Sequence, residues 1–114
     1  MRVALLCILL TSLAFADAKT LFVNCKTCHG KYAEKPKGTK TAPANLTEDQ
    51  IVYALTKYRD SFQTASGNSK IMATNVRRFT DQDIVEIAAY IKQVQAERQA
   101  EIEALAAEQM KALE

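Results

Sequence analysis

The sequence is poor in the residues that break regular structure or form flexible connections. Only three glycines and two prolines occur in 114 residues, and no stretch is repetitive or of low complexity. Linkers between domains are rich in such residues. Their scarcity excludes a chain of several modules, and the length that follows the first 16 residues suits one small domain.

Nitrogen and sulfur ligands for metals are also scarce. The chain has one histidine, His29, and three cysteines, Cys7, Cys25 and Cys28. A structural zinc site needs four such ligands, and Cys7 lies in an N-terminal segment that we expect to be removed. The sequence therefore lacks a full set of zinc ligands.

Long apolar runs are absent except at the N-terminus. Residues 1–16 begin with one positive charge at Arg2, continue as a short apolar run and end in an A-x-A pattern at Ala16, with a second such pattern ending at Ala18. These features predict a secretory signal peptide cleaved after Ala16 or Ala18. The run is shorter than the ~20 residues of a spanning helix, so a retained membrane anchor is the alternative.

What the sequence does contain is Cys25-Lys26-Thr27-Cys28-His29. C-x-x-C-H is the attachment site of c-type haem. Residues three apart on a helical turn lie on one face, so both thiols can add to the two vinyl groups at one porphyrin edge. His29 can then reach the iron as an axial ligand. The alternatives are a thioredoxin-like dithiol, which needs a preceding strand that we do not find, and a plain disulfide in an exported protein.

The segment after the motif is predicted to be a loop that orients the histidine. Gly30 lets the chain leave the helix, and residues 31–45 contain two prolines and a glycine that exclude a continuous helix. We expect a loop carbonyl to accept the Nδ1 proton of His29 and so fix its tautomer. Pro36 is the first candidate for this acceptor and Pro43 the second.

Three helices are predicted around this loop. The first runs from residue 17 or 18 into the motif. The second begins with a capping box, Thr47 as N-cap and Gln50 three residues later, and the third begins at Thr80 in the same way. Between them, residues 59–70 lose helical periodicity, and residues 66–69 read as a turn. The apolar positions at helical spacing are Ile51, Val52, Leu55 and Tyr58 in the second helix, and Ile84, Ile87, Ala88, Ile91 and Val94 in the third.

A sixth ligand for the iron is predicted by elimination. A thioether sulfur favours reduced iron, and of the three methionines Met1 is in the signal segment and Met110 in the remote tail. Met72 follows the predicted turn and is therefore the expected axial ligand. A lysine from the loop, or an open coordination position, is the alternative.

Charge is distributed unevenly. Residues 17–78 carry eleven basic and five acidic side chains, a net charge of +6, whereas residues 79–114 carry three and eight, a net charge of −5. Basic charge near the haem could steer an acidic redox partner, or it could simply be a solvated loop. Nucleic-acid binding has no motif in its favour. The lysines clustered around the motif are Lys26, Lys31, Lys35, Lys37 and Lys40.

Taken together, the haem motif after Leu21-Phe22, then Met72, and then residues 75–81 leading into Ile87-Ala88-Ala89-Tyr90-Ile91 resemble the small bacterial class I cytochromes c of the short periplasmic monohaem type. The likeness covers about residues 18–95. It implies an all-α fold of three to four helices around one covalent haem, with the first and last helices crossing near Phe22 and Tyr90. It also implies His29 and Met72 as axial ligands and electron transfer between redox proteins.

Two features depart from that pattern. Ala73 stands where many relatives have proline after the ligand methionine, so we expect the ligand segment to be held differently. Residues 96–114 exceed the pattern and should extend the last helix, either as a solvated extension or as a docking or dimerising helix.

The sequence thus predicts a periplasmic electron carrier and not an enzyme. The alternative is a haem enzyme, or a gas or peroxide sensor, with an open iron site.

Overall fold

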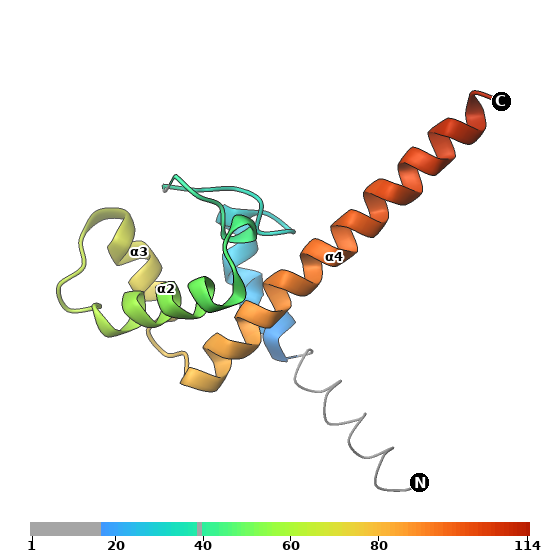
Figure 1. Cartoon of the computed structure of the whole chain (residues 1–114). Helices are drawn as coiled ribbons and strands as arrows, with labels where there is room; N and C mark the ends of the chain where they lie inside the picture. The colour runs from blue at the N-terminus through green and yellow to red at the C-terminus, as the bar shows by residue number, and fades with distance from the viewer. Residues whose placement is uncertain (1–16, 39) are drawn as a thin grey trace, which may run out of the picture.

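The computed structural model describes residues 17–38 and 40–114, and every regular element in that part of the chain is helical (Figure 1). This confirms the predicted all-α class. The predicted signal peptide, residues 1–16 with Cys7, lies outside the described residues. The elements are a helical segment over residues 17–29, called the motif helix below, the 3₁₀ turn η1 (Pro43–Asn45), α2 (Glu48–Asp60), α3 (Gly67–Val76) and α4 (Asp81–Ala112).

Capping boxes start α2 and α4 at the predicted positions. The Thr47 hydroxyl accepts from the Gln50 N–H at 3.1 Å, and the Gln50 side chain accepts from the Thr47 N–H at 2.9 Å. Thr80 and Asp83 form the same reciprocal pair, at 3.0 Å in each direction. Each box satisfies two backbone donors that a helix N-terminus leaves without an intrahelical acceptor.

The segment predicted as a turn, residues 66–69, is instead the start of α3. Ser66 is the N-cap, in an extended conformation, and Gly67 opens the helix with a φ of +57°. Serine, glycine and asparagine are common both in turns and at helix starts, so the pattern did not separate the two. As a result, Met72 lies in the middle of a helix and not in the loop after a turn.

The core lies where the motif helix crosses α4. The Phe22 ring meets the Tyr90 ring edge to face, with centroids 5.4 Å apart and planes at 60°, so the crossing that the resemblance implied is confirmed. Phe22 packs in one buried cluster with Ile51 of α2 and with Ile87 and Ile91 of α4.

Two cationic side chains tie connecting segments to this core. Arg59 of α2 donates to the Phe79 carbonyl at 3.0 Å and pairs with Asp81 at 2.7 Å, which joins α2 to the start of α4. Lys92 of α4 donates to the carbonyls of Ala44 and Leu46, at 3.2 and 2.9 Å. The two hydrogen bonds of Lys92 hold η1 against α4.

The last helix continues well beyond the core. α4 has 32 residues, and its C-terminal part projects away from the other helices (Figure 1). Residues 96–112 therefore extend the last helix, as predicted, and every residue from 99 to the C-terminus is exposed. Among the described residues, none of the helices is both long and apolar enough to cross a membrane.

Candidate functional site

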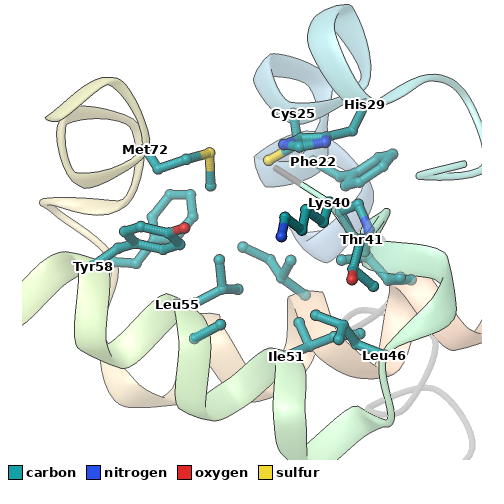
Figure 2. A pocket seen from close by; sticks show the side chains of 15 residues that line it. Phe22, Cys25, His29, Lys40, Thr41, Leu46, Ile51, Leu55, Tyr58 and Met72 are labelled. Atoms are coloured by element: carbon teal, nitrogen blue, oxygen red, sulfur yellow. The ribbon is translucent and has the colours of Figure 1, made fainter. Parts of the chain in front are cut away.

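A largely apolar cavity of about 260 Å³ lies between the motif helix, α2, α3 and α4 (Figure 2). Ile51, Leu55 and Tyr58, three of the four apolar positions predicted in the second helix, line one side of it. The residues that line it are Phe22, Cys25, His29, Lys40, Thr41, Pro43, Leu46, Ile51, Ala54, Leu55, Tyr58, Met72, Phe79, Ile87 and Ile91.

His29, the last residue of the motif helix, is buried and held at both its ring and its backbone. Its Nδ1 donates to the Lys35 carbonyl at 2.8 Å, and the Lys35 N–H donates to the His29 carbonyl at 2.9 Å. The ring hydrogen bond fixes the tautomer and leaves Nε2 as the nitrogen that can bind a metal. Gly30, with a φ of +86°, starts the turn that makes this possible.

The predicted acceptor for His29 was therefore wrong by one residue. We expected the carbonyl of Pro36, with Pro43 as second candidate, and the acceptor is that of Lys35. A proline restricts the residue before it to extended conformations. Pro36 thus influences the carbonyl of Lys35 more than its own.

The two cysteines lie in the last turns of the motif helix. Cys25 is half-buried and borders the main cavity, and Cys28 is exposed. A smaller adjoining cavity of about 110 Å³ is bordered by Cys25, Cys28, His29 and Met72. Because the two cavities share Cys25, His29 and Met72, they are two parts of one site, and both thiols reach it.

The environment of Cys25 differs from that of a redox-active dithiol. Burial, with a smaller contribution from the Cys28 sulfur, raises the pKa of the Cys25 thiol to about 11. Reactive dithiols have lowered thiol pKa values and typically lie at a helix N-terminus, whereas this pair lies at a C-terminal end, where the helix dipole disfavours a thiolate. The thioredoxin-like alternative is therefore disfavoured.

Met72 reaches the cavity from α3, on the opposite side from His29 and Cys25 (Figure 2). The next residue, Ala73, stands where many relatives have proline, and it is fully buried. Packing of α3 therefore holds the segment around Met72 in place. The ring of Phe62, in the α2–α3 connection, supports α3 further. Lys70 lies over this ring at 3.6 Å from its centroid, and Arg77 at 4.1 Å.

Three polar cavity residues were not predicted from the sequence. The Lys40 amine points into the cavity between Met72 and the motif helix, and the Tyr58 hydroxyl points inward below Met72 (Figure 2). Thr41 lies beside Lys40. Tyr58 was identified only as part of an apolar stripe, and Lys40 only as one of the clustered lysines of the loop, any of which was the alternative ligand to Met72. Helical periodicity gives no signal for the orientation of a loop lysine or for the use of a tyrosine hydroxyl.

The five clustered lysines are all exposed but do not share one environment. Lys31 lies over the Tyr32 ring, and its pKa is raised first by a hydrogen bond with the Tyr32 side chain and then by the charges of Tyr32 and Glu101. Lys37 borders the smaller cavity, beside Cys28, and Lys40 points into the main one. Lys26 and Lys35 extend into solvent.

This set of residues fits a covalently attached haem. Within residues 17–38 and 40–114, no three His, Cys, Asp or Glu side chains are grouped to hold a metal ion. Besides the Cys25 thiol and the Tyr58 hydroxyl, the side chains at the cavity that could bind iron are one imidazole, one thioether and one amine. Apolar walls suit a porphyrin ring, adjoining thiols suit attachment at its edge, and an imidazole and a thioether on opposite sides of the cavity suit its iron.

The comparison with known proteins agrees with this geometry. Residues 15–95 match the cytochrome c family, a range that contains the motif helix, the loop, α2, α3 and the core half of α4. No curated protein matches the chain significantly. Members of this family carry covalently attached haem c with its iron. They act in haem-based electron transfer, with redox proteins as partners. With its all-helical fold and its C-x-x-C-H motif at the cavity, the chain belongs to the cytochrome c family, as a small class I member with covalently attached haem.

Proposed function

We propose that this protein is a one-electron carrier of the periplasm in which His29 and Met72 bind the haem iron from opposite sides. Cys25 and Cys28 carry the thioether bonds. The observation that supports this most directly is the arrangement of the site: an imidazole with a fixed tautomer and a thioether sulfur face each other across an apolar cavity. With both axial positions filled by the chain, a substrate has no free coordination position.

The bound haem supplies a reversible change of iron oxidation state, and the protein sets the conditions for it. Lys35 makes the His29 ring a stronger donor through the Nδ1 hydrogen bond. Met72 favours the reduced state because a thioether is a weak donor. The buried side chains of Phe22, Ile51 and Ile87 keep water from that part of the cavity.

Replacing the proposed sulfur ligand tests this function. We expect Met72→Ala to lower the reduction potential by on the order of 0.1 V, because the loss of the thioether removes its preference for reduced iron. The variant should also lose the weak far-red band of sulfur-ligated ferric haem and bind carbon monoxide when reduced. Met110→Ala is the matched control, since Met110 is exposed on the far part of α4.

The rival ligand has its own variant. If the Lys40 amine is the sixth ligand, Lys40→Ala will change the ferric spectrum and Met72→Ala will not. An open iron position, as in a haem enzyme or gas sensor, predicts rapid carbon monoxide binding by the unaltered protein. Either result would overturn the assignment of Met72.

The site of action follows from the predicted signal peptide. Export through residues 1–16 would bring the chain to the compartment where c-type haem is attached, and partners would be redox proteins of the same compartment. Intact mass of the mature holoprotein tests this step. A mass that starts after Ala16 or Ala18 and includes one haem supports it, and an unprocessed chain contradicts it.

A further inference from the structure

We propose that residues 95–101 of α4 form a positioning element for His29, acting through Tyr32 on the turn that presents the Lys35 carbonyl to the ring. The inference rests on the proposed function in one respect: it concerns a histidine taken to be an iron ligand. It assigns a role to the part of α4 that continues beyond the family match.

Two side chains of α4 form hydrogen bonds with Tyr32. The Gln95 side-chain amide donates to the Tyr32 carbonyl, and the Tyr32 hydroxyl donates to the Glu101 carboxylate. These bonds hold the residue at both ends, at its backbone and at the tip of its ring. They join positions 63 and 69 residues apart in the chain, so the helix fixes the loop and does not merely lie beside it.

Two cationic side chains also contact the Tyr32 ring. Lys31 lies 5.0 Å from the centroid of the Tyr32 ring, and Arg98 of α4 lies 5.8 Å from it. Arg98 stands one helical turn before Glu101, so the ring contact and the hydroxyl contact come from one face of α4. Gln95, Arg98 and Glu101 of α4 thus all contact one tyrosine, as does Lys31 of the loop.

Tyr32 is connected to His29 by a short series of hydrogen bonds within residues 29–35, some between backbone atoms and some to side chains. The Tyr32 N–H donates to the Glu34 carboxylate at 2.9 Å, and the Ala33 N–H donates to the Gly30 carbonyl at 3.1 Å. Ala33 is fully buried with a φ of +55°, a conformation that a non-glycine residue keeps only when its surroundings enforce it. The turn then closes with the reciprocal pair between Lys35 and His29. Fixing Tyr32 therefore fixes the acceptor for Nδ1.

The test compares variants of the holoprotein that differ in these contacts alone. The double variant Gln95→Ala, Glu101→Ala removes both hydrogen bonds to Tyr32. Its matched control is Gln99→Ala, Glu108→Ala, the same changes on the same helix, at exposed positions away from Tyr32. Tyr32→Phe is the milder variant, since it removes only the hydroxyl bond to Glu101.

The readouts are exchange of the His29 Nδ1 proton with solvent, followed by NMR in the reduced protein, and the reduction potential. We expect the double variant to exchange this proton about tenfold faster, because a loosened turn opens more often, and its potential to rise, because a weaker Nδ1 hydrogen bond makes the imidazole a poorer donor. Tyr32→Phe should show a smaller change in the same direction. Exchange and potential equal to those of the control in both variants would overturn the proposal.

Failure of the proposed function is read separately, from the unaltered protein. An axial His29 has imidazole signals strongly shifted by the haem ring current. Their absence would reject the ligand role, whereas the comparison of exchange rates would still decide whether α4 positions the ring.

Discussion

At the scale of single residues, the site depends most on a contact made by backbone atoms. Lys35 holds His29 through its N–H and its carbonyl, and its side chain extends into solvent. The chemistry of this position therefore comes from the peptide unit. Replacing the side chain and replacing the N–H should have different effects.

We expect Lys35→Pro to lower the free energy of unfolding of the holoprotein by about 1–3 kcal/mol, because proline has no N–H to donate to the His29 carbonyl. Lys35→Ala keeps both backbone contacts and should change that free energy by less than about 0.5 kcal/mol. Urea titration followed by haem absorbance measures both. Equal losses in the two variants would show that the lysine side chain, and not its backbone, supports the histidine.

Sequence patterns predicted which side chains line the site better than they predicted what holds those side chains in place. The two cysteines and the histidine follow from a spacing that one turn of helix imposes. Met72 came from elimination, and it does line the cavity opposite His29. The Lys35 carbonyl could not be predicted, because every residue has a carbonyl and only the path of the turn decides which one reaches the ring.

At the scale of elements, α3 carries Met72 with little support from its own caps. The Ser66 side chain makes no capping hydrogen bond, and the helix has only ten residues, a length that is marginal without tertiary packing. The contacts of Lys70 and Arg77 with Phe62 supply part of that packing. The Lys70 amine also donates to the Phe62 carbonyl at 2.7 Å.

We therefore expect Phe62→Leu to lower the free energy of unfolding by about 1–2 kcal/mol, since each cation–π contact contributes about 0.5–1 kcal/mol. The far-red band should also disappear at a lower temperature than in the unaltered protein. Tyr53→Leu is the control, because Tyr53 is largely exposed and has one such contact, with Lys57 at 5.8 Å from the centroid. A larger loss in the control would rule out the assigned role of Phe62.

The two helices that begin with a capping box, α2 and α4, were predicted correctly. The start of α3, which has no capping box, was predicted as a turn. Thr47 and Thr80 each have a partner three residues later that returns the hydrogen bond. α3 starts from a polar Ser-Gly-Asn-Ser sequence with no such partner, so local pattern favoured a turn. Packing of Ala73 and Val76 against the rest of the molecule decides the helix, and no local pattern contains that information.

At the scale of the whole molecule, charge separates along the chain. The half that carries the haem motif has a net charge of +6, and the half that contains α4 has −5. Lys31 lies over the Tyr32 ring, and Glu101 of the acidic half accepts from the hydroxyl of the same tyrosine. Lys37 borders the smaller cavity together with the exposed Cys28, so it lies at the edge where the thiols would attach the cofactor.

We expect Lys37→Glu to slow oxidation of the reduced protein by ferricyanide, a small trianion, by about threefold to tenfold at low salt. Lys111→Glu makes the same charge change on the far part of α4 and should have a much smaller effect, because Lys111 lies about 30 Å along the helix from Ile91 at the cavity. Stopped-flow rates across a salt series measure both. A rate that is insensitive to salt would mean that this surface does not steer anions.

The length of α4 has a practical consequence for attaching the protein to something else. Its final turns project away from the other helices (Figure 1), beyond Glu101, which accepts a hydrogen bond from Tyr32 of the loop. A linker, a dye or an electrode surface joined at Glu114 would be held away from the cofactor pocket. The molecule can thus be immobilised by its C-terminus while the face that exchanges electrons stays open to solution.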